Sequence, residues 1–293
     1  MEVETRGPQT TNDIDTLIEQ ALLLDLETGA DGEVHKIGAM RGGREFRREG
    51  RFELSAALDA LTAFAGDAPY VVGHNLLGHD LPTLRALAPA LTLLGRPIVD
   101  TLYLSPLAFP QNPYHRLVKD YKLVRDSVAD PVADCRLAAQ VLREQGEALA
   151  RRLADGADAA DVDLLAVYRF CFQGATLLDD NPTGGDGIAA VFRCLGAALP
   201  DVAQVRDTLL GRWQGRACTT VAARLILHHI KDIRLRPVLA YAAAWLTVAG
   251  GNSVLPPWVR QRFPATASLL TALREVPCGQ PDCAWCRDAH DPK

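Results

Sequence analysis

Residues 21–28 have the sequence Ala-Leu-Leu-Leu-Asp-Leu-Glu-Thr, and this stretch decides the fold. Its consecutive apolar residues, followed closely by Gly29 and Gly32, predict a buried β-strand that runs into acidic positions. Asp25 and Glu27 are two positions apart and therefore share one face of that strand. Paired carboxylates repel each other unless a cation lies between them, and their oxygens suit Mg²⁺ or Mn²⁺. Alternatively, the strand simply ends in solvent with an acidic tip, so the choice depends on further ligands elsewhere in the chain.

Two further acidic residues occupy the starts of predicted helices. Asp80 follows a short strand near residue 70 and a polar turn, at a helix N-terminus whose dipole favours its charge. Asp134 lies in the first turn of a helix that begins at Asp130 and Pro131. Each acid taken alone is equally well explained as an N-cap or a surface residue. Only their combination with Asp25 and Glu27 indicates a metal site.

The four acids resemble the motifs of the DEDD superfamily of 3′–5′ exonucleases, the DnaQ-like group of the ribonuclease-H-like fold. The resemblance covers roughly residues 18–145. It rests on these segments: Asp25-Leu26-Glu27-Thr28, Gly73-His74-Asn75 through His79-Asp80, Ile98-Val99-Asp100-Thr101-Leu102 and Asp130-Pro131-Val132-Ala133-Asp134. It implies that Asp25, Glu27, Asp80 and Asp134 hold two Mg²⁺ or Mn²⁺ ions. One ion would activate the attacking water, and the other would stabilise the leaving 3′ oxygen of a DNA strand.

The sequence departs from the family at the general base. Family members carry a His five residues before the last Asp or a Tyr four residues before it, and these positions hold Ala129 and Asp130. Because general bases supply about 10²- to 10⁴-fold in rate, a slow enzyme is expected. His115, between the second and third motifs, is a candidate replacement, and His79 is another. The alternative for either histidine is a loop or packing role.

Nucleic-acid contacts are expected close to the metal site. The net charge of −5 argues against non-specific coating of DNA, which needs a basic surface. The resemblance implies contacts from Thr28, His74 and Asn75. A basic strip offers phosphate contacts, although it equally fits an ordinary solvated face. Its members are His115, Arg116, Lys119, Lys122 and Arg125.

Composition and patterning predict two domains in a chain of 293 residues with 48% hydrophobic and 23% charged residues. The expected fold is α/β, a ribonuclease-H-like mixed five-stranded sheet with flanking helices, followed by an all-α domain and a small zinc knuckle. The predicted parts are a flexible arm at 1–17, an exonuclease-like domain at 18–153, a helical domain at 154–272 and the knuckle at 273–293. Strands are expected at 20–26, 34–41, 45–53, 70–73 and 97–100, and helices at 55–65, 80–94, 131–152, 162–173, 187–197, 201–212, 218–229 and 235–248. The absence of an apolar run of about 18 residues or more and of a signal-like N-terminus predicts a cytoplasmic protein without a membrane partner.

The knuckle is predicted from a cluster of metal-ligand residues near the C-terminus. Cys278, Cys283, Cys286 and His290 have the spacing C-x4-C-x2-C-x3-H, and soft S and N ligands in fours suit a structural, tetrahedral Zn²⁺. Disulfides are the alternative, which the odd total of seven cysteines and a cytoplasmic location disfavour. The other cysteines, expected to be core or surface thiols, are Cys135, Cys171, Cys194 and Cys218.

Segments 112–123, 252–257 and 278–291 look like the N-terminal region of large bacterial RecQ-type helicases, in which an exonuclease-like domain precedes the motor. That similarity implies a helicase motor as a partner, within one longer polypeptide or as a separate chain. The sequence has no phosphate-binding Gly-x-x-x-x-Gly-Lys-Ser/Thr motif, so these residues do not form an ATP-driven motor. Three functions follow: a 3′–5′ exonuclease on single-stranded or frayed DNA in repair or replication, an inactive exonuclease fold that binds DNA ends or a partner, and an interaction module built on the helical half and knuckle.

Overall fold

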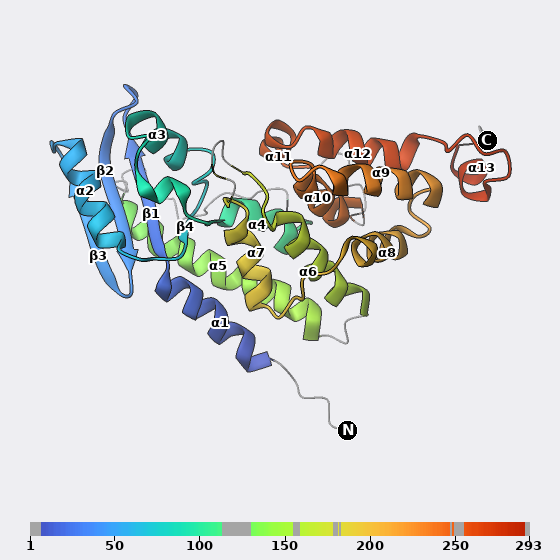
Figure 1. The fold of residues 1–293 in the computed structure, drawn as a ribbon, viewed down its shortest axis with the longest axis horizontal. Helices are drawn as coiled ribbons and strands as arrows, with labels where there is room; N and C mark the ends of the chain where they lie inside the picture. Colours follow the sequence, from blue (N-terminus) through green and yellow to red (C-terminus); the bar gives the residue numbers. More distant parts are fainter. Residues whose placement is uncertain are drawn as a thin grey trace.

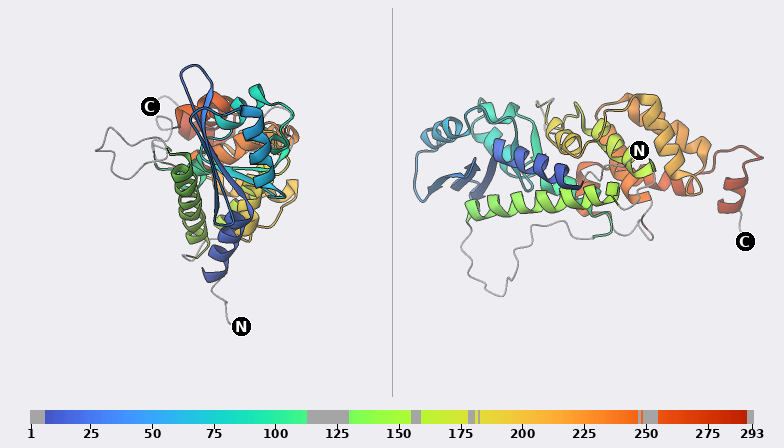
Figure 2. Two further views of the ribbon diagram at one scale, coloured as in Figure 1. Left: turned by 90° about the vertical axis from the view of Figure 1, so that its left-hand side faces the viewer. Right: turned by 90° about the horizontal axis from the view of Figure 1, so that it is seen from below.

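The computed structural model describes residues 7–112, 130–154, 159–177, 181, 183–246, 248 and 255–290. A β-sheet lies at one end of an elongated molecule, and helices extend from it to α13 (Ala284–His290) at the opposite end (Figures 1 and 2). Within the described ranges, none of the helices combines the length and the apolar character that a membrane crossing requires.

The sheet is mixed and has five strands in the order β3-β2-β1-β4-β5. Its strands are β1 (Leu22–Thr28), β2 (Val34–Arg41), β3 (Arg44–Glu49), β4 (Val71–Gly73) and β5 (Ile98–Asp100). The pairs β1–β2 and β2–β3 are antiparallel, whereas β1–β4 and β4–β5 are parallel. The predicted α/β class with a mixed five-stranded sheet is therefore confirmed, and β1 continues two residues further than expected, through the acidic positions.

The helices of the α/β part cover both faces of this sheet. They are α1 (Gly7–Gln20), α2 (Leu54–Ala65), α3 (Asp80–Leu87), the short 3₁₀ helix η1 (Thr92–Gly95), α4 (Thr101–Ala108) and α5 (Pro131–Ala154). Asp25, Gly38 and Arg47 lie opposite one another on β1, β2 and β3, so they share one face, against which α5 packs. Phe46 faces the other way and contacts Phe64 of α2, with ring centroids 5.6 Å apart. The long helix α5 therefore lies on the acidic face of the sheet.

Two predictions for this part are wrong. The chain from Gly7 is helical instead of a loose arm, because Ile14, Leu17 and Ile18 form a short apolar stripe that is buried where α1 packs on α5 and α7 (Asp186–Cys194). The helix expected over 80–94 ends at Leu87. Pro89 disfavours helical geometry at the residue before it, and the chain resumes as η1.

The second half is helical, as the sequence predicts. Besides α7 and α13 it contains α6 (Ala159–Phe172), α8 (Val202–Trp213), α9 (Thr219–Lys231), α10 (Arg236–Leu246), α11 (Pro257–Arg262) and α12 (Ala265–Glu275). One continuous cluster of buried side chains runs from the sheet into these helices. Tyr241 of α10, for example, is fully buried and donates its hydroxyl proton to the carbonyl oxygen of Tyr103 at 3.1 Å. The helical half is therefore anchored on the α/β part by a shared core.

A close approach between α7 and β5 makes this junction sensitive to side-chain size. A Cβ atom at Gly187 would lie 2.2 Å from the carbonyl oxygen of Ile98, a contact that needs backbone movement. We expect Gly187→Ala to lower the free energy of unfolding by about 3 kcal/mol or more, since overpacking typically costs 1–3 kcal/mol even without a backbone clash. Denaturant unfolding followed by circular dichroism measures this loss.

Gly211→Ala is the matched control, because no heavy atom lies within 4 Å of a Cβ built at that exposed position of α8. It should leave stability unchanged or raise it by about 0.5–1 kcal/mol. Equal effects of the two substitutions would show that α7 does not pack on β5 through Gly187.

Candidate functional site

Three of the four predicted acids meet at the end of β1. Asp25 and Glu27 project from one face of the strand, and Asp134 comes from the first turn of α5. Each offers a carboxylate oxygen, and these three oxygens lie within 4.8 Å of one another. Segments more than a hundred residues apart in the sequence therefore form one group of carboxylates that could hold a cation.

A glycine opposite Asp25 allows Asp134 to reach this group. Gly38 pairs with Asp25 in the β1–β2 ladder. A Cβ atom on Gly38 would lie 2.5 Å from the carbonyl carbon of Pro131 and 2.6 Å from the amide nitrogen of Val132. The first turn of α5 consequently rests directly on the backbone of β2, a contact that only glycine permits. An isolated glycine in a strand pattern, as Gly38 is in β2, is the sequence signal for such a close approach.

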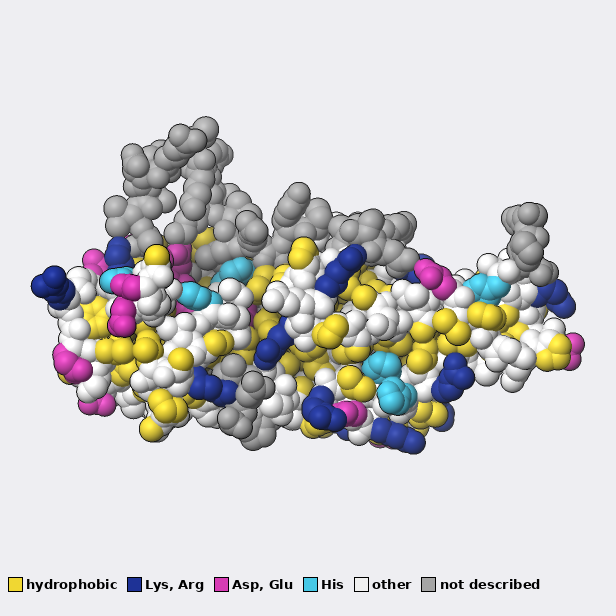
Figure 3. Space-filling model, turned by 90° about the horizontal axis from the view of Figure 1, so that it is seen from above, with side chains coloured by type: hydrophobic (Ala, Val, Ile, Leu, Met, Phe, Trp, Pro, Cys, Tyr) yellow, Lys and Arg dark blue, Asp and Glu magenta, His cyan; other side chains and the backbone are white. Residues whose placement is uncertain are grey.

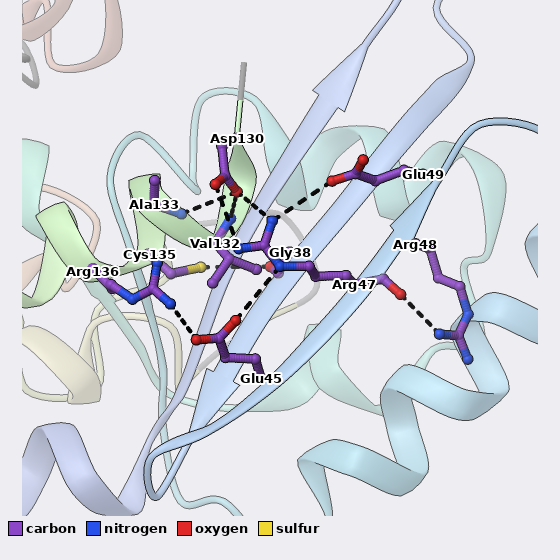
Figure 4. A network of polar contacts seen from close by, with 10 residues as sticks. All are labelled: Gly38, Glu45, Arg47, Arg48, Glu49, Asp130, Val132, Ala133, Cys135 and Arg136. Carbon is purple, nitrogen blue, oxygen red and sulfur yellow. Dashed lines mark hydrogen bonds and ion pairs between the residues drawn. The ribbon is translucent and has the colours of Figure 1, made fainter. Parts of the chain in front are cut away.

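Two ion pairs hold the start of α5 against β3 (Figure 4). The Arg47 guanidinium donates to Asp130 at 2.8 Å, and Arg136 pairs with Glu45. Asp130 also caps the helix, accepting from the amide nitrogens of Val132 at 3.0 Å and Ala133 at 3.3 Å. These contacts fix the helix that carries Asp134.

The same contacts occupy Asp130, which stands where the family pattern can place a tyrosine base. Partial burial acts to raise the pKa of Asp130, but the hydrogen bonds from Arg47 and the two backbone amides outweigh it and lower that pKa. A carboxylate that is stabilised in its charged form is a poor proton acceptor. Asp130 is therefore a capping and anchoring residue in this structure.

Asp80, the fourth predicted acid, is buried beside the other three. Its side chain is 2% exposed, and its Oδ1 accepts from the amide nitrogen of Leu26 at 2.7 Å, between Asp25 and Glu27 along β1. Burial and then the charge of Asp25 raise the pKa of Asp80 well above its ordinary value. The structure thus brings Asp80 to the same strand end, although it is not one of the three carboxylates that lie within 4.8 Å.

The charges of these acids affect the pKa of the buried Cys135 thiol. Burial raises the pKa of Cys135 well above its ordinary value, and neighbouring negative charges add to the effect. Those charges belong to Asp25, Asp80, Asp134 and Asp130. Four carboxylates therefore lie close enough to this buried thiol to affect its charge state. A positive side chain shares their face, since Lys36 pairs with Glu27 in the β1–β2 ladder.

A buried carboxylate to which the sequence analysis assigned no role, Asp100, positions the turn before α3. Asp100 is fully buried and accepts from the amide nitrogens of Asn75 at 2.8 Å, Leu77 at 2.9 Å and Leu102 at 3.0 Å. Burial raises its pKa to about 6. Asn75 adopts a φ of 63°, so this turn is held in a geometry that few residues favour. An Asp immediately before the helical segment at Thr101 was the available signal.

We expect Asp100→Asn to destabilise the protein by about 1–3 kcal/mol. The asparagine amide would direct its N–H₂ group at a backbone N–H from which the carboxylate now accepts a hydrogen bond. A buried donor would then be left unsatisfied. Thermal unfolding measures this loss. Asp59→Asn, at an exposed position of α2, is the control and should change stability by less than about 0.5 kcal/mol. An Asp100→Asn variant that is as stable as the wild type would contradict this positioning role.

The predicted nucleic-acid contacts are only partly placed by the structure. His79 is exposed beside Thr28, with 3.4 Å between its Nε2 and the Thr28 Oγ1, so both lie at the rim of the acidic group. His74 is half-buried and tied to Thr101, with 2.9 Å between its Nδ1 and the Thr101 Oγ1. The predicted basic strip and the position of the missing base lie outside the described residues. The strip consists of His115, Arg116, Lys119, Lys122 and Arg125, and the base position is Ala129.

A second group of potential metal ligands lies at the other end of the molecule and differs from the predicted knuckle in one member. Cys278, Cys283 and Cys286 meet Cys218, and their four sulfur atoms lie within 4.8 Å of one another. His290, the predicted fourth ligand, is not in this group, and its ring lies beside that of Trp285 with centroids 5.5 Å apart. Cys218 was expected to be an ordinary core or surface thiol. No sequence spacing connects it to residues sixty positions away.

Comparisons with protein-family models, with curated proteins and with solved structures find no match to this chain. The function is therefore inferred from the geometry of the two groups and from the motif resemblance.

Proposed function

We propose that this protein is a divalent-metal-dependent 3′–5′ exonuclease that removes nucleotides from single-stranded or frayed DNA 3′ ends. The observation that carries the proposal is the meeting of Asp25, Glu27 and Asp134 within 4.8 Å. These residues, with Asp80, occupy the first, second and last motifs of the DEDD pattern in the order that the superfamily has them.

The residues at this site fit Mg²⁺ or Mn²⁺. All three close ligands are carboxylates, which these hard cations prefer, and no sulfur or imidazole is in the group. Asp25, Glu27 and Asp134 would hold the metal. Asp80 would fix the position of the strand between Asp25 and Glu27, because it accepts a hydrogen bond from the Leu26 amide. When bound, two such ions supply an activated water and charge stabilisation for phosphodiester hydrolysis.

Side chains around the acids would bind and orient the DNA end. Thr28 and His79 lie together at the rim and offer hydrogen bonds to a terminal nucleotide. Lys36, on the same face as Glu27, adds a positive charge for a phosphate. On the face drawn in Figure 3, acidic side chains gather over the α/β end, and Lys and Arg side chains are more frequent over the helical part. The negatively charged DNA backbone would therefore be attracted more strongly to the helical part than to the acidic group itself.

A second candidate function is an exonuclease fold that binds DNA ends or a protein partner without cutting. It is favoured by Ala129 and Asp130 at the two positions where the family carries a base. Asp130 is committed to Arg47 and to the cap of α5. Either function is compatible with a helicase motor as a partner in DNA repair or replication, which we include in the proposal.

A degradation assay separates the two candidates. Single-stranded DNA labelled at its 5′ end is incubated with the protein and Mg²⁺, with Mn²⁺, or with chelator. The exonuclease predicts a ladder of products that shorten stepwise from the 3′ end, with either metal and not with chelator. A 3′-phosphorylated strand and a circular strand control for end recognition. Retarded but intact DNA would contradict the exonuclease and support the binding module.

A further inference from the structure

We propose that Cys218, Cys278, Cys283 and Cys286 form a structural zinc site that fastens the C-terminal segment to the start of α9. This site is about as far from the acidic group as the molecule allows, with α13 at the end opposite the sheet (Figure 1). The inference does not depend on the proposed exonuclease activity.

The sulfur positions match a tetrahedral metal site. Zinc–thiolate bonds of about 2.3 Å place the sulfurs of a tetrahedral Cys₄ site about 3.8 Å apart. The Cys218 and Cys283 sulfurs are 3.7 Å apart, and the Cys278 and Cys286 sulfurs are 3.5 Å apart. These two separations are opposite edges of the tetrahedron, and all four sulfurs lie within 4.8 Å. Four thiolates in this arrangement leave no position open for substrate, which makes the site structural.

The backbone favours thiolates at these positions. Cys218 is the N-cap of α9, where the helix dipole stabilises negative charge. The amide nitrogen of Cys278 donates to the Cys286 sulfur at 3.3 Å. Zinc binds the deprotonated sulfur, so both features lower the free energy of the metal-bound state.

The C-terminal segment has little else to hold it in place. Within residues 276–290, Cys286 is the one buried side chain, and Val276 is 41% exposed. The small apolar cluster here contains Cys218, Val221 and Cys286, and it is separate from the main core. Short segments with so few buried side chains usually depend on a disulfide or a metal for their order. All four cysteines are free thiols in this structure, and a metal bound by them would supply this order.

Metal analysis of the full 293-residue chain tests the ligand set. Protein purified without chelator should contain one zinc per chain. Cys218→Ser should weaken zinc binding on the order of 100-fold or more, because it removes one of four ligands. His290→Ala should keep the zinc, as should Cys194→Ser, which removes a thiol from outside the group. In the cobalt-substituted protein, the thiolate-to-metal absorption of the wild type should match that of His290→Ala.

The opposite pattern, with zinc lost in His290→Ala and retained in Cys218→Ser, would overturn the assignment. So would wild-type protein that contains no zinc and either four reactive thiols or two disulfides at these cysteines. If Cys218→Ser does not fold, the zinc content and thiol state of the wild type still test the assignment.

Chelation should speed amide hydrogen exchange in 276–290 and in the first turn of α9 and leave exchange in β1 unchanged. Unchanged exchange in both 276–290 and the first turn of α9 would reject the fastening role.

Discussion

Replacing Asp25 by asparagine should lower the rate of 3′-end degradation by about 10³-fold or more. The amide keeps the size of the side chain and removes the negative charge that, with Glu27 and Asp134, would hold the cations. Loss of metal-borne charge stabilisation is worth several kcal/mol, and about 4 kcal/mol corresponds to 10³-fold in rate. Single-turnover degradation of a labelled strand, at saturating protein and Mn²⁺, measures the effect without a contribution from product release.

Asp59→Asn is the matched control for this prediction. It makes the same chemical change at an exposed position of α2, which packs on the opposite face of the sheet. Its rate should stay within about twofold of the wild type, as expected for a surface substitution away from the site. An Asp25→Asn variant that degrades DNA as fast as Asp59→Asn would remove Asp25 from the catalytic group.

Gly38→Ala should reduce the same rate by about 10²-fold, although Gly38 has no atom that could bind a metal. An added Cβ would lie 2.5 Å from the carbonyl carbon of Pro131, so the first turn of α5 must move away from β2. That movement carries Asp134 away from Asp25, and a shift of about 1 Å in a reacting group can cost 10²-fold. Mn²⁺ affinity should fall in parallel, which calorimetry measures.

Gly95→Ala controls for the general effect of replacing a glycine. No heavy atom lies within 4 Å of a Cβ built at this exposed position, so rate and metal affinity should not change. If Gly38→Ala retained full activity and affinity, the contact between β2 and α5 would not set the position of Asp134.

Local patterns predicted most of the elements because each signal lies within a few residues. The apolar run before Asp25 identifies β1, and Asp130-Pro131 identifies the start of α5. The arm prediction failed because α1 is polar on average, and Ile14, Leu17 and Ile18 are the side chains that tertiary packing buries within its described part, 13–20. A short stripe in a polar segment gives little periodic signal.

The two sites differ in how far the sequence could predict them. The acids could be grouped because their motifs resemble those of a known superfamily. The contacts that position the acids join segments that are distant in sequence. Gly38 of β2 lies directly against the first turn of α5, and Arg47 of β3 pairs with Asp130. Three members of the cysteine group follow from short spacing, but Cys218 is brought in by the packing of α9 on α12, and His290, which was chosen because it is close in sequence, lies outside the group.

The most direct test of the acidic centre is a Mn²⁺ titration by calorimetry. Wild-type protein, with its cysteine site first loaded with zinc, should show saturable binding of about two Mn²⁺ ions. The double variant Asp25→Asn, Asp134→Asn should lose this binding, and Asp59→Asn should retain it. Identical titrations of wild type and double variant would contradict the claim that these carboxylates form a divalent-metal centre.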